Sequence, residues 1–315
     1  MNIDDNLLSV DVGYSYVKYI YSSNKKIISN KIPTAVLELA ENSKINIDDI
    51  FEKKGKKYIL GKYAELKGAY LELDINKLIE YAPLFILKII KDNKIDCSDL
   101  KIVTGLSIKD IDKANDLIKE ITNYLGENKI KTSIDVLPQG RGVAYDFYYE
   151  KKDIPKRYVV IDIGYNTFDF ISIILNQMDL DDSFANSKGI NLILEEIVSN
   201  IKNEYSIEYS ISELNANLSE NNHFIFYRGN KIDITVLIDK AVKNYLSTIK
   251  NICDTKAKNS LNVAQEIILA GGGSYLLQQV SKEVFNNVFG NAKISFIEEP
   301  EFSNARGYYK RSVKK

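Results

Sequence analysis

The chain has 315 residues, 45% of them hydrophobic, so it can bury a substantial core and is long enough to favour two domains. Its 42 basic and 43 acidic residues nearly cancel, which excludes nucleic-acid coating or strong membrane-surface attraction as a bulk property. The only cysteines, Cys97 and Cys253, lie far apart, which excludes a disulfide framework and fits a reducing cytoplasm.

The N-terminal residues MNIDDNLLSVDVG place acids where a secretory signal would be positive. A membrane helix needs about 20 consecutive apolar residues. The nearest run, 82–90, contains Pro83 and Lys88. The sequence therefore predicts a cytoplasmic protein with no membrane partner.

The first half alternates strands and helices. An apolar strand ends in Asp11-Val12-Gly13, and a second β-rich run follows after a tight turn, which predicts a hairpin. Pro83 marks a kink or a fresh start in the first long helix. The predicted elements are strands at 7–10 and 16–21, a helix at 75–91, a strand at 101–106, a helix at 111–125 and a strand at 133–137.

The opening pattern recurs in the second half. A buried strand at 157–162 again ends in Asp-Ile-Gly, and a β-rich run at 168–175 follows. About half the chain separates Asp11 from Asp162, which indicates duplication of one α/β unit. Further predicted elements are helices at 189–201 and 236–252 and a strand at 266–270, whereas the terminal RSVKK reads as a loose tail.

These patterns predict two domains. Domain I spans 1–150 and carries an inserted subdomain at about 30–70. The C-terminal residues 300–315 return to this domain. Domain II spans 151–299, with a second inserted subdomain at about 202–262. Both insertions are predicted from polar stretches that interrupt the α/β alternation.

Three strand-to-turn junctions carry residues suited to a nucleotide. Glycine lets backbone amides approach an anion, and an aspartate at a strand end can hold hydrated Mg²⁺. The turn after Asp11 alone would more often be an ordinary hairpin, but the turn after Asp162 repeats it. The third junction, Gly271-Gly272-Gly273-Ser274, offers flat backbone to a base or ribose. With His223 as the only histidine, a catalytic triad and a multi-histidine zinc site are excluded.

The motif order resembles that of actin-like ATPases. The segments DVGYSYVK, VLPQGRGVAY, VIDIGYNTFD, ILAGGGS and EEPEFSNARGYY resemble the two phosphate loops, two connecting segments and adenosine loop of that superfamily. IPT at Ile32, YILGKYA at Tyr58 and IVTGLSI at Ile102 are most similar to plasmid-segregating actins of the ParM type and their archaeal relatives. The resemblance implies an α/β, actin-like (ribonuclease H-like) duplicated two-domain ATPase fold with inserted small subdomains and a nucleotide cleft between its halves.

The resemblance also implies roles for individual residues. Asp11 and Asp162 would hold Mg²⁺ through water, and Gln139 would orient the attacking water. Because glutamine is no strong base, slow hydrolysis is expected. Asp169 would support the second loop or the metal. The nucleotide would be bound by Gly13, Tyr14, Ser15, Lys18, Gly164, Tyr165, Asn166 and Thr167 at the phosphates, by Gly271, Gly272, Gly273 and Ser274 at the adenosine, and by Lys188, Gly189 and Glu213 at the base or ribose.

Fold alone does not select the function. The expected function is an ATP- or GTP-dependent, Mg²⁺-dependent filament that segregates plasmid DNA, with hydrolysis timing its disassembly. Its partners would be further copies of itself and a small DNA-binding adaptor on centromere-like DNA, without direct DNA binding. The alternatives are a small-molecule kinase or phosphatase of the same fold, and a nucleotide-binding regulator that does not polymerise.

Overall fold

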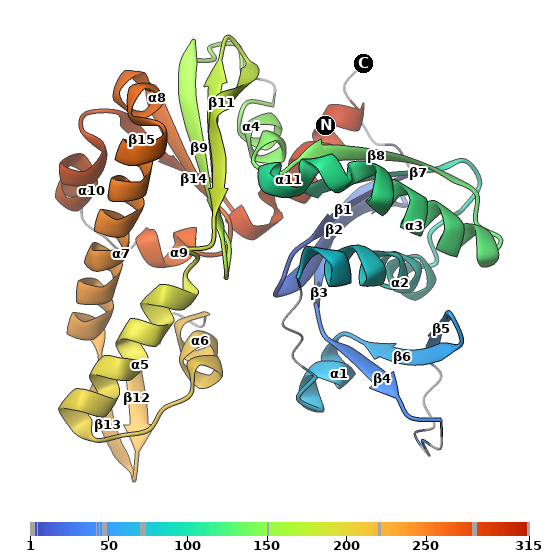
Figure 1. Cartoon of the computed structure of the whole chain (residues 1–315), viewed down its shortest axis with the longest axis horizontal. Helices are drawn as coiled ribbons and strands as arrows, with labels where there is room; N and C mark the ends of the chain where they lie inside the picture. The colour runs from blue at the N-terminus through green and yellow to red at the C-terminus, as the bar shows by residue number, and fades with distance from the viewer. Residues whose placement is uncertain are drawn as a thin grey trace. The chain divides into compact units, whose positions relative to one another are not determined.

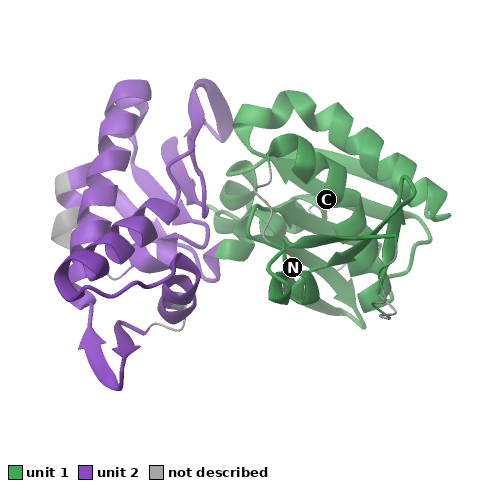
Figure 2. Cartoon of the chain, turned by 60° about the horizontal axis from the view of Figure 1, so that its bottom comes forward, with its two compact units in different colours: residues 1–152, 301–315 green, residues 153–300 purple. Residues whose placement is uncertain are grey.

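The computed structural model describes residues 4, 6–41, 43, 45, 49–69, 74–149, 151–219, 222–278 and 282–313. The chain divides into two compact units (Figure 2). Unit 1 comprises Met1–Lys152 and Glu301–Lys315, and unit 2 comprises Asp153–Pro300. Each unit is built around its own five-stranded mixed sheet.

The sheet of unit 1 has the strand order β3-β2-β1-β7-β8 (Figure 1). β2 runs antiparallel to both β1 and β3, whereas β1, β7 and β8 are parallel. The predicted hairpin and the strands after it are confirmed. The strands are β1 (Leu7–Val12), β2 (Tyr16–Ser23), β3 (Lys26–Pro33), β7 (Leu100–Leu106) and β8 (Thr132–Pro138).

Helices cover both faces of this sheet. Successive residues of a strand point to opposite faces, so Leu8 and Val10 join the core formed with α2 and α3, while Leu7 packs with residues of α11. By the same alternation Asp11 lies on the face of Leu7. The helical elements of unit 1 outside its small sheet are α2 (Ile75–Asn93), η1 (Ile108–Lys113), α3 (Ala114–Glu127), α4 (Arg141–Phe147) and α11 (Ser303–Val313).

Helix α2 is continuous through Pro83, where the sequence predicts a kink or a fresh helix start. It begins after Asp74, whose carboxylate accepts a hydrogen bond from the backbone N–H of Lys77 at 2.9 Å. It then runs through the buried Pro83 to Asn93. Of the two alternatives at Pro83, the fresh start does not occur, because the residues beyond Pro83 pack in the same core as those before it.

The segment predicted as the first insertion forms a small sheet of its own, with the order β4-β6-β5. Phe51, Tyr58 and Leu60 of this sheet are buried in the core shared with α2 and α3. The small sheet is therefore packed onto unit 1 through its apolar side chains. Its elements are β4 (Val36–Leu39), β5 (Phe51–Lys53), β6 (Lys56–Leu60) and the short helix α1 (Lys62–Leu66).

The sheet of unit 2 repeats that of unit 1, with the order β11-β10-β9-β14-β15. β10 runs antiparallel to β9 and β11, and β9, β14 and β15 are parallel. The duplication predicted from the recurring Asp-x-Gly motif is thus present in the topology. The strands are β9 (Arg157–Ile163), β10 (Phe168–Ile174), β11 (Gln177–Asn186), β14 (Glu266–Ala270) and β15 (Lys293–Phe296).

One large apolar core joins this sheet to helices α5 and α7. The amphipathic helix predicted at 236–252 is confirmed within α7. Among the described residues, no helix is both long and apolar enough to cross a membrane. The remaining elements of unit 2 are α5 (Asn191–Tyr205), α6 (Ile211–Ser219), β12 (Phe224–Tyr227), β13 (Asn230–Asp233), α7 (Thr235–Lys256), α8 (Lys258–Val263), α9 (Ser274–Leu277), α10 (Lys282–Phe289) and η2 (Pro300–Phe302), the last of which leads into unit 1.

The C-terminal helix extends further than expected. RSVKK was expected to be a loose tail, but 311–313 continue α11. Val313 is buried in a cluster with Leu7, and the Arg311 guanidinium lies 2.8 Å from the Asp135 carboxylate. The expectation is wrong for these residues because their contacts with the sheet hold the last helical turn. Residues 314–315 lie outside the described part of the chain.

Replacing Gly307 with alanine is expected to destabilise the protein. Where α11 crosses α4, a Cβ on Gly307 would overlap the carbonyl oxygen of Gly142 and lie 3.0 Å from the backbone nitrogen of Asp146. Overpacking of this kind costs about 1–3 kcal/mol, so the free energy of unfolding measured in urea should fall by that amount. Gly126→Ala in α3 is the control, since its Cβ would meet nothing within 4 Å. It should raise stability by about 0.5–1 kcal/mol. Unchanged stability in Gly307→Ala would contradict the close crossing.

Candidate functional site

The first predicted phosphate loop joins β1 to β2. Asp11 is 4% exposed at the end of β1, and Lys18 is its cross-strand partner in β2. Lys18 Nζ lies 3.7 Å from Asp11 Oδ2 and 2.7 Å from where a Cβ on Gly13 would be. The structure therefore brings a carboxylate, an ammonium group and the glycine of the turn together.

The turn of this loop is fixed by a neighbouring strand end. The backbone N–H of Gly13 donates to the carbonyl of Tyr16 at 3.2 Å. The Thr34 hydroxyl donates to the Gly13 carbonyl at 2.7 Å, and the Thr34 N–H donates to the Ser15 carbonyl at 2.9 Å. Tyr14 is half-buried and packs against the core of unit 1. Sequence reasoning gave Thr34 no role, although it closes the IPT segment that carried part of the family resemblance.

Gln139 lies beside Asp11, although 128 positions separate the two residues in sequence. It follows β8, which is joined to β1 through β7. Its side-chain nitrogen Nε2 donates to Asp11 Oδ1 at 2.7 Å. Because the amide nitrogen of Gln139 faces Asp11, its Oε1 is left as an acceptor. The structure thus places Gln139, expected to orient the attacking water, beside Asp11 of the first loop.

The second hairpin repeats the first in register but differs in charge. Asp162 is 9% exposed at the end of β9, and its cross-strand partner is Asp169, which is 4% exposed. Asp169 thus holds the position that Lys18 holds opposite Asp11. One loop pairs an acid with a cation, whereas the other pairs two acids on the same face of the ladder.

The turn after Asp162 is also built like the first one. The Gly164 N–H donates to the carbonyl of Thr167 at 2.8 Å, the counterpart of the bond that closes the first turn. Tyr165 and Thr167 are half-buried, and Asn166 is exposed at the tip. Burial raises the pKa of the Tyr165 hydroxyl, with the Glu195 carboxylate adding to the shift. The tyrosine therefore stays neutral at physiological pH.

The segment before α5 packs against this second turn. A Cβ on Gly189 would overlap the backbone of Tyr165, so only glycine permits the observed approach. The preceding carbonyl, that of Lys188, accepts a hydrogen bond from the Tyr245 hydroxyl at 2.8 Å. Burial raises the pKa of Tyr245, which keeps this donor protonated. The Lys188 side chain itself is exposed.

The glycine-rich loop after β14 lies against the end of β9. Gly271 has a φ of 76°, and a Cβ there would overlap Asp162 Oδ1 and the Ile163 carbonyl. The Gly273 N–H donates to the Ile163 carbonyl at 2.9 Å. Ser274 is fully buried, and its hydroxyl donates to the Gly271 carbonyl at 2.8 Å. The third predicted motif is therefore adjacent to the second, within the same unit.

Glu213 has a structural role in the described geometry. Its backbone N–H donates to Ser210 Oγ at 3.1 Å, and the Ser210 hydroxyl and N–H donate to its carboxylate at 2.6 and 3.2 Å. This reciprocal arrangement is a capping box at the start of α6. It lowers the pKa of the Glu213 carboxyl. The carboxylate is exposed, as is Gly272 in the glycine-rich loop.

The residues present suit a magnesium ion that travels with a nucleotide. In the described part of the chain, no three His, Cys, Asp or Glu side chains gather to hold a metal on their own. Mg²⁺ commonly keeps several waters and needs only one or two carboxylates beside substrate phosphates. Each unit offers one such buried carboxylate at a strand end, Asp11 in unit 1 and Asp162 in unit 2. Since both oxygens of Asp11 already face Gln139 and Lys18, contact through water fits better than direct coordination.

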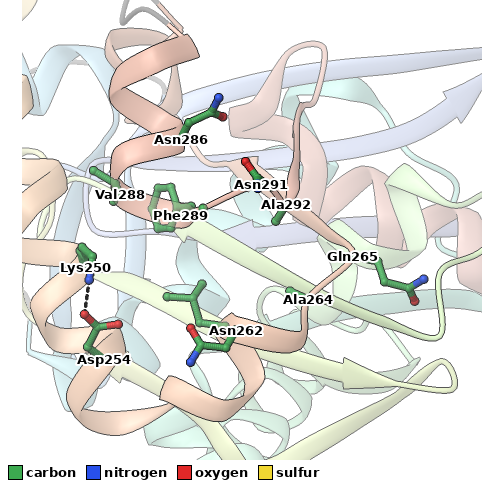
Figure 3. A pocket seen from close by; sticks show the side chains of 12 residues that line it. Lys250, Asp254, Asn262, Ala264, Gln265, Asn286, Val288, Phe289, Asn291 and Ala292 are labelled. Atoms are coloured by element: carbon green, nitrogen blue, oxygen red, sulfur yellow. Dashed lines mark hydrogen bonds and ion pairs between the residues drawn. The ribbon is translucent and has the colours of Figure 1, made fainter.

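A separate cavity of about 550 Å³ lies in unit 2 (Figure 3). It is formed around α7, α8 and α10, and the ion pair between Lys250 and Asp254 lies on its wall. None of the predicted site residues lines it. The other residues around it are Leu261, Asn262, Ala264, Gln265, Asn286, Val288, Phe289, Gly290, Asn291 and Ala292.

Two units of one topology, each with an aspartate at a strand end and a glycine turn after it, define an actin-like fold. Two family models match the chain. Residues 9–150 match the N-terminal domain of actin-like proteins, and residues 160–283 match the C-terminal domain of the archaeal actin homologue that resembles MreB. The chain therefore belongs to the actin-like proteins.

Solved structures agree along the whole chain. The native archaeal actin homologue Ta0583 is 21% identical with a TM-score of 0.77, over 97% of this chain and 98% of that one. Its complex with ADP is 20% identical with a TM-score of 0.72, over the same shares. A ParM from Clostridium botulinum, solved as a 15-stranded filament, is 23% identical with a TM-score of 0.72, over 99% and 100%. These likenesses confirm the predicted fold. Comparison with curated protein sequences gave no match.

Proposed function

We propose that this protein is a nucleoside triphosphatase that polymerises with bound ATP or GTP and disassembles after hydrolysis, and that its filaments segregate plasmid DNA. The hydrogen bond from Gln139 to Asp11 is the observation that carries the proposal. It joins the residue expected to orient water to the residue expected to hold the metal. A protein that only bound nucleotide would not need that pairing.

The backbone amides of the two glycine turns and Lys18 would bind the phosphates, and the glycine-rich loop after β14 would contact the nucleoside. Asp11 and Asp162 would hold Mg²⁺ through water, and the ion would neutralise phosphate charge. The base or ribose would be contacted by Lys188, Gly189 and Glu213. Glu213 would make this contact while its carboxylate also accepts the hydrogen bonds of the capping box.

Hydrolysis by this site would be slow. The Oε1 atom of Gln139 can accept a hydrogen bond from a water molecule and so orient it. An amide does not take up the proton, so the side chain contributes positioning without general-base catalysis. A slow reaction suits a timer that sets how long a subunit stays in a filament.

The polymerisation half of the proposal rests on the similarity to filament-forming relatives. The match to the C. botulinum ParM solved as a filament covers 99% of this chain and 100% of that one. Nucleotide binding would change the conformation of the subunit and so its contacts with neighbouring subunits, as in other proteins that a bound ligand switches between conformations. With a net charge of −1, the chain would reach DNA through a small adaptor protein bound to a centromere-like site.

Light scattering and sedimentation of the protein with Mg-ATP and Mg-GTP, alongside phosphate release, test the proposal. We expect scattering to rise on nucleotide addition and to decay as phosphate is released. Protein that stays monomeric at high concentration with every nucleotide would exclude a filament. Turnover that appears only with an added small-molecule substrate would instead indicate a kinase or phosphatase.

A further inference from the structure

The first turn of α11 contacts the turn that carries Gln139. Asn304 Oδ1 accepts a hydrogen bond from the backbone N–H of Gly140 at 2.9 Å, and both groups are buried. Asn304 is 5% exposed and stands 164 positions from Gly140 in sequence. Gly140 has a φ of 74° and comes directly before α4. The bond therefore joins the last helix of the chain to the residue next to Gln139.

This bond fixes the direction of the Gln139 side chain. The backbone N–H of Gln139 donates to the Leu106 carbonyl at 2.8 Å, which holds the peptide plane before the residue. Asn304 holds the Gly140 N–H, which belongs to the peptide plane after it. With both planes held, the φ and ψ angles of Gln139 are set, and its Cα–Cβ bond has one direction. From that Cβ position the side chain reaches Asp11, with Nε2 2.7 Å from Oδ1.

The contact depends on an unusually close approach of α11 to α4. A Cβ on Gly142 would lie 2.7 Å from the Asn304 carbonyl and 2.9 Å from its Cα, so glycine at this position lets the backbones meet. At the far end of α4, the Asp146 carboxylate is 3% exposed and accepts hydrogen bonds from Arg306 at 2.7–2.9 Å and from Lys310 at 2.7 Å. Asn304 and these two cations hold α4 at both ends.

We propose that Asn304 is a positioning residue for hydrolysis, acting through Gly140 to aim Gln139. The inference rests on the proposed function, since it assumes that Gln139 orients the attacking water. The bond from Gly140 joins Asn304 to the backbone next to Gln139, in the turn before α4. Its loss should therefore slow hydrolysis without weakening nucleotide binding.

The test compares Asn304→Ala with a matched control, Ser9→Ala. The Ser9 hydroxyl donates to the carbonyl of Ala305 at 2.6 Å, so each variant removes a buried hydrogen bond at the same turn of α11. We expect Asn304→Ala to lower kcat for phosphate release by about tenfold. A change of that size corresponds to the loss of roughly one hydrogen bond, here the one that helps to orient Gln139. Affinity for a fluorescent ADP analogue should stay within about twofold of wild type in both variants. Ser9→Ala should hydrolyse as wild type does.

A double-mutant cycle separates positioning from general packing. If Asn304 acts through Gln139, Asn304→Ala adds no further loss of kcat in a Gln139→Ala background. An additive loss, or equal effects of Asn304→Ala and Ser9→Ala, would overturn the inference while leaving the proposed function in place. Absence of phosphate release by the wild type would overturn both. Asn304→Ser, which leaves a smaller void, gives the same readings if the alanine variant does not fold.

Discussion

Asp162→Ala is expected to lower the rate of phosphate release by at least about 100-fold, the effect typical of removing one fixed charge-stabilising group from such a site. Asp162 stands at the end of β9, 9% exposed, beside the glycine-rich loop. In the proposed function it holds the nucleotide's Mg²⁺ through water. The measurement is single-turnover phosphate release with Mg-ATP and with Mg-GTP.

The fold of the variant should survive. The ladder between β9 and β10 is formed by the backbone, and its partner opposite, Asp169, is also an acid. Because the substitution removes only side-chain atoms, the backbone hydrogen bonds of this ladder remain. Asp181→Ala is the matched control, because Asp181 is an exposed acid on β11 of the same sheet.

Three results are possible for this pair of variants. Loss of phosphate release in Asp162→Ala alone supports the assigned site. Hydrolysis at the wild-type rate in Asp162→Ala would show that the activity arises elsewhere, and would contradict the assignment. A lowered melting temperature would point to a structural role, which circular dichroism of both variants would reveal.

Much of the fold could be predicted because its signals are local. The strand that ends in Asp11 and the strand that ends in Asp162 each carry a buried run followed by a glycine turn. Their recurrence half a chain apart predicted the repeated topology that the two sheets share. The spacing from each aspartate to its cross-strand partner is also the same, since Asp11 pairs with Lys18 and Asp162 with Asp169.

The contacts that hold the loops could not be predicted, because they join residues that no periodicity relates. Three such side chains form hydrogen bonds with loops that are distant in sequence. The separation is 21 positions for Thr34, 57 for Tyr245 and 164 for Asn304. Their side chains are ordinary in sequence, and only the packing of strands and helices brings them to their partners. The same reason explains why a loose tail is wrongly predicted at 311–313. Val313 is buried only because α11 packs against the first sheet.

Gln139→Ala is expected to lengthen filament lifetime while slowing hydrolysis. The Nε2 of Gln139 is held by Asp11 Oδ1 at 2.7 Å, so the alanine variant loses the oriented acceptor without disturbing the backbone of β8. Loss of a group that orients a reacting water can cost roughly 100-fold in rate. Because the two phosphate loops are intact in the variant, nucleotide binding and assembly should proceed as in the wild type.

The measurement is light scattering after a limiting pulse of Mg-ATP, with phosphate release followed in the same sample. In the wild type the scattering should decay as phosphate appears, whereas in Gln139→Ala both processes should slow together. Gln177→Ala, at an exposed position of β11, serves as the control and should match the wild type. If filaments of Gln139→Ala disassemble at the wild-type rate despite slow hydrolysis, the reaction does not time disassembly. The timer would then lie in the subunit contacts and not in Gln139.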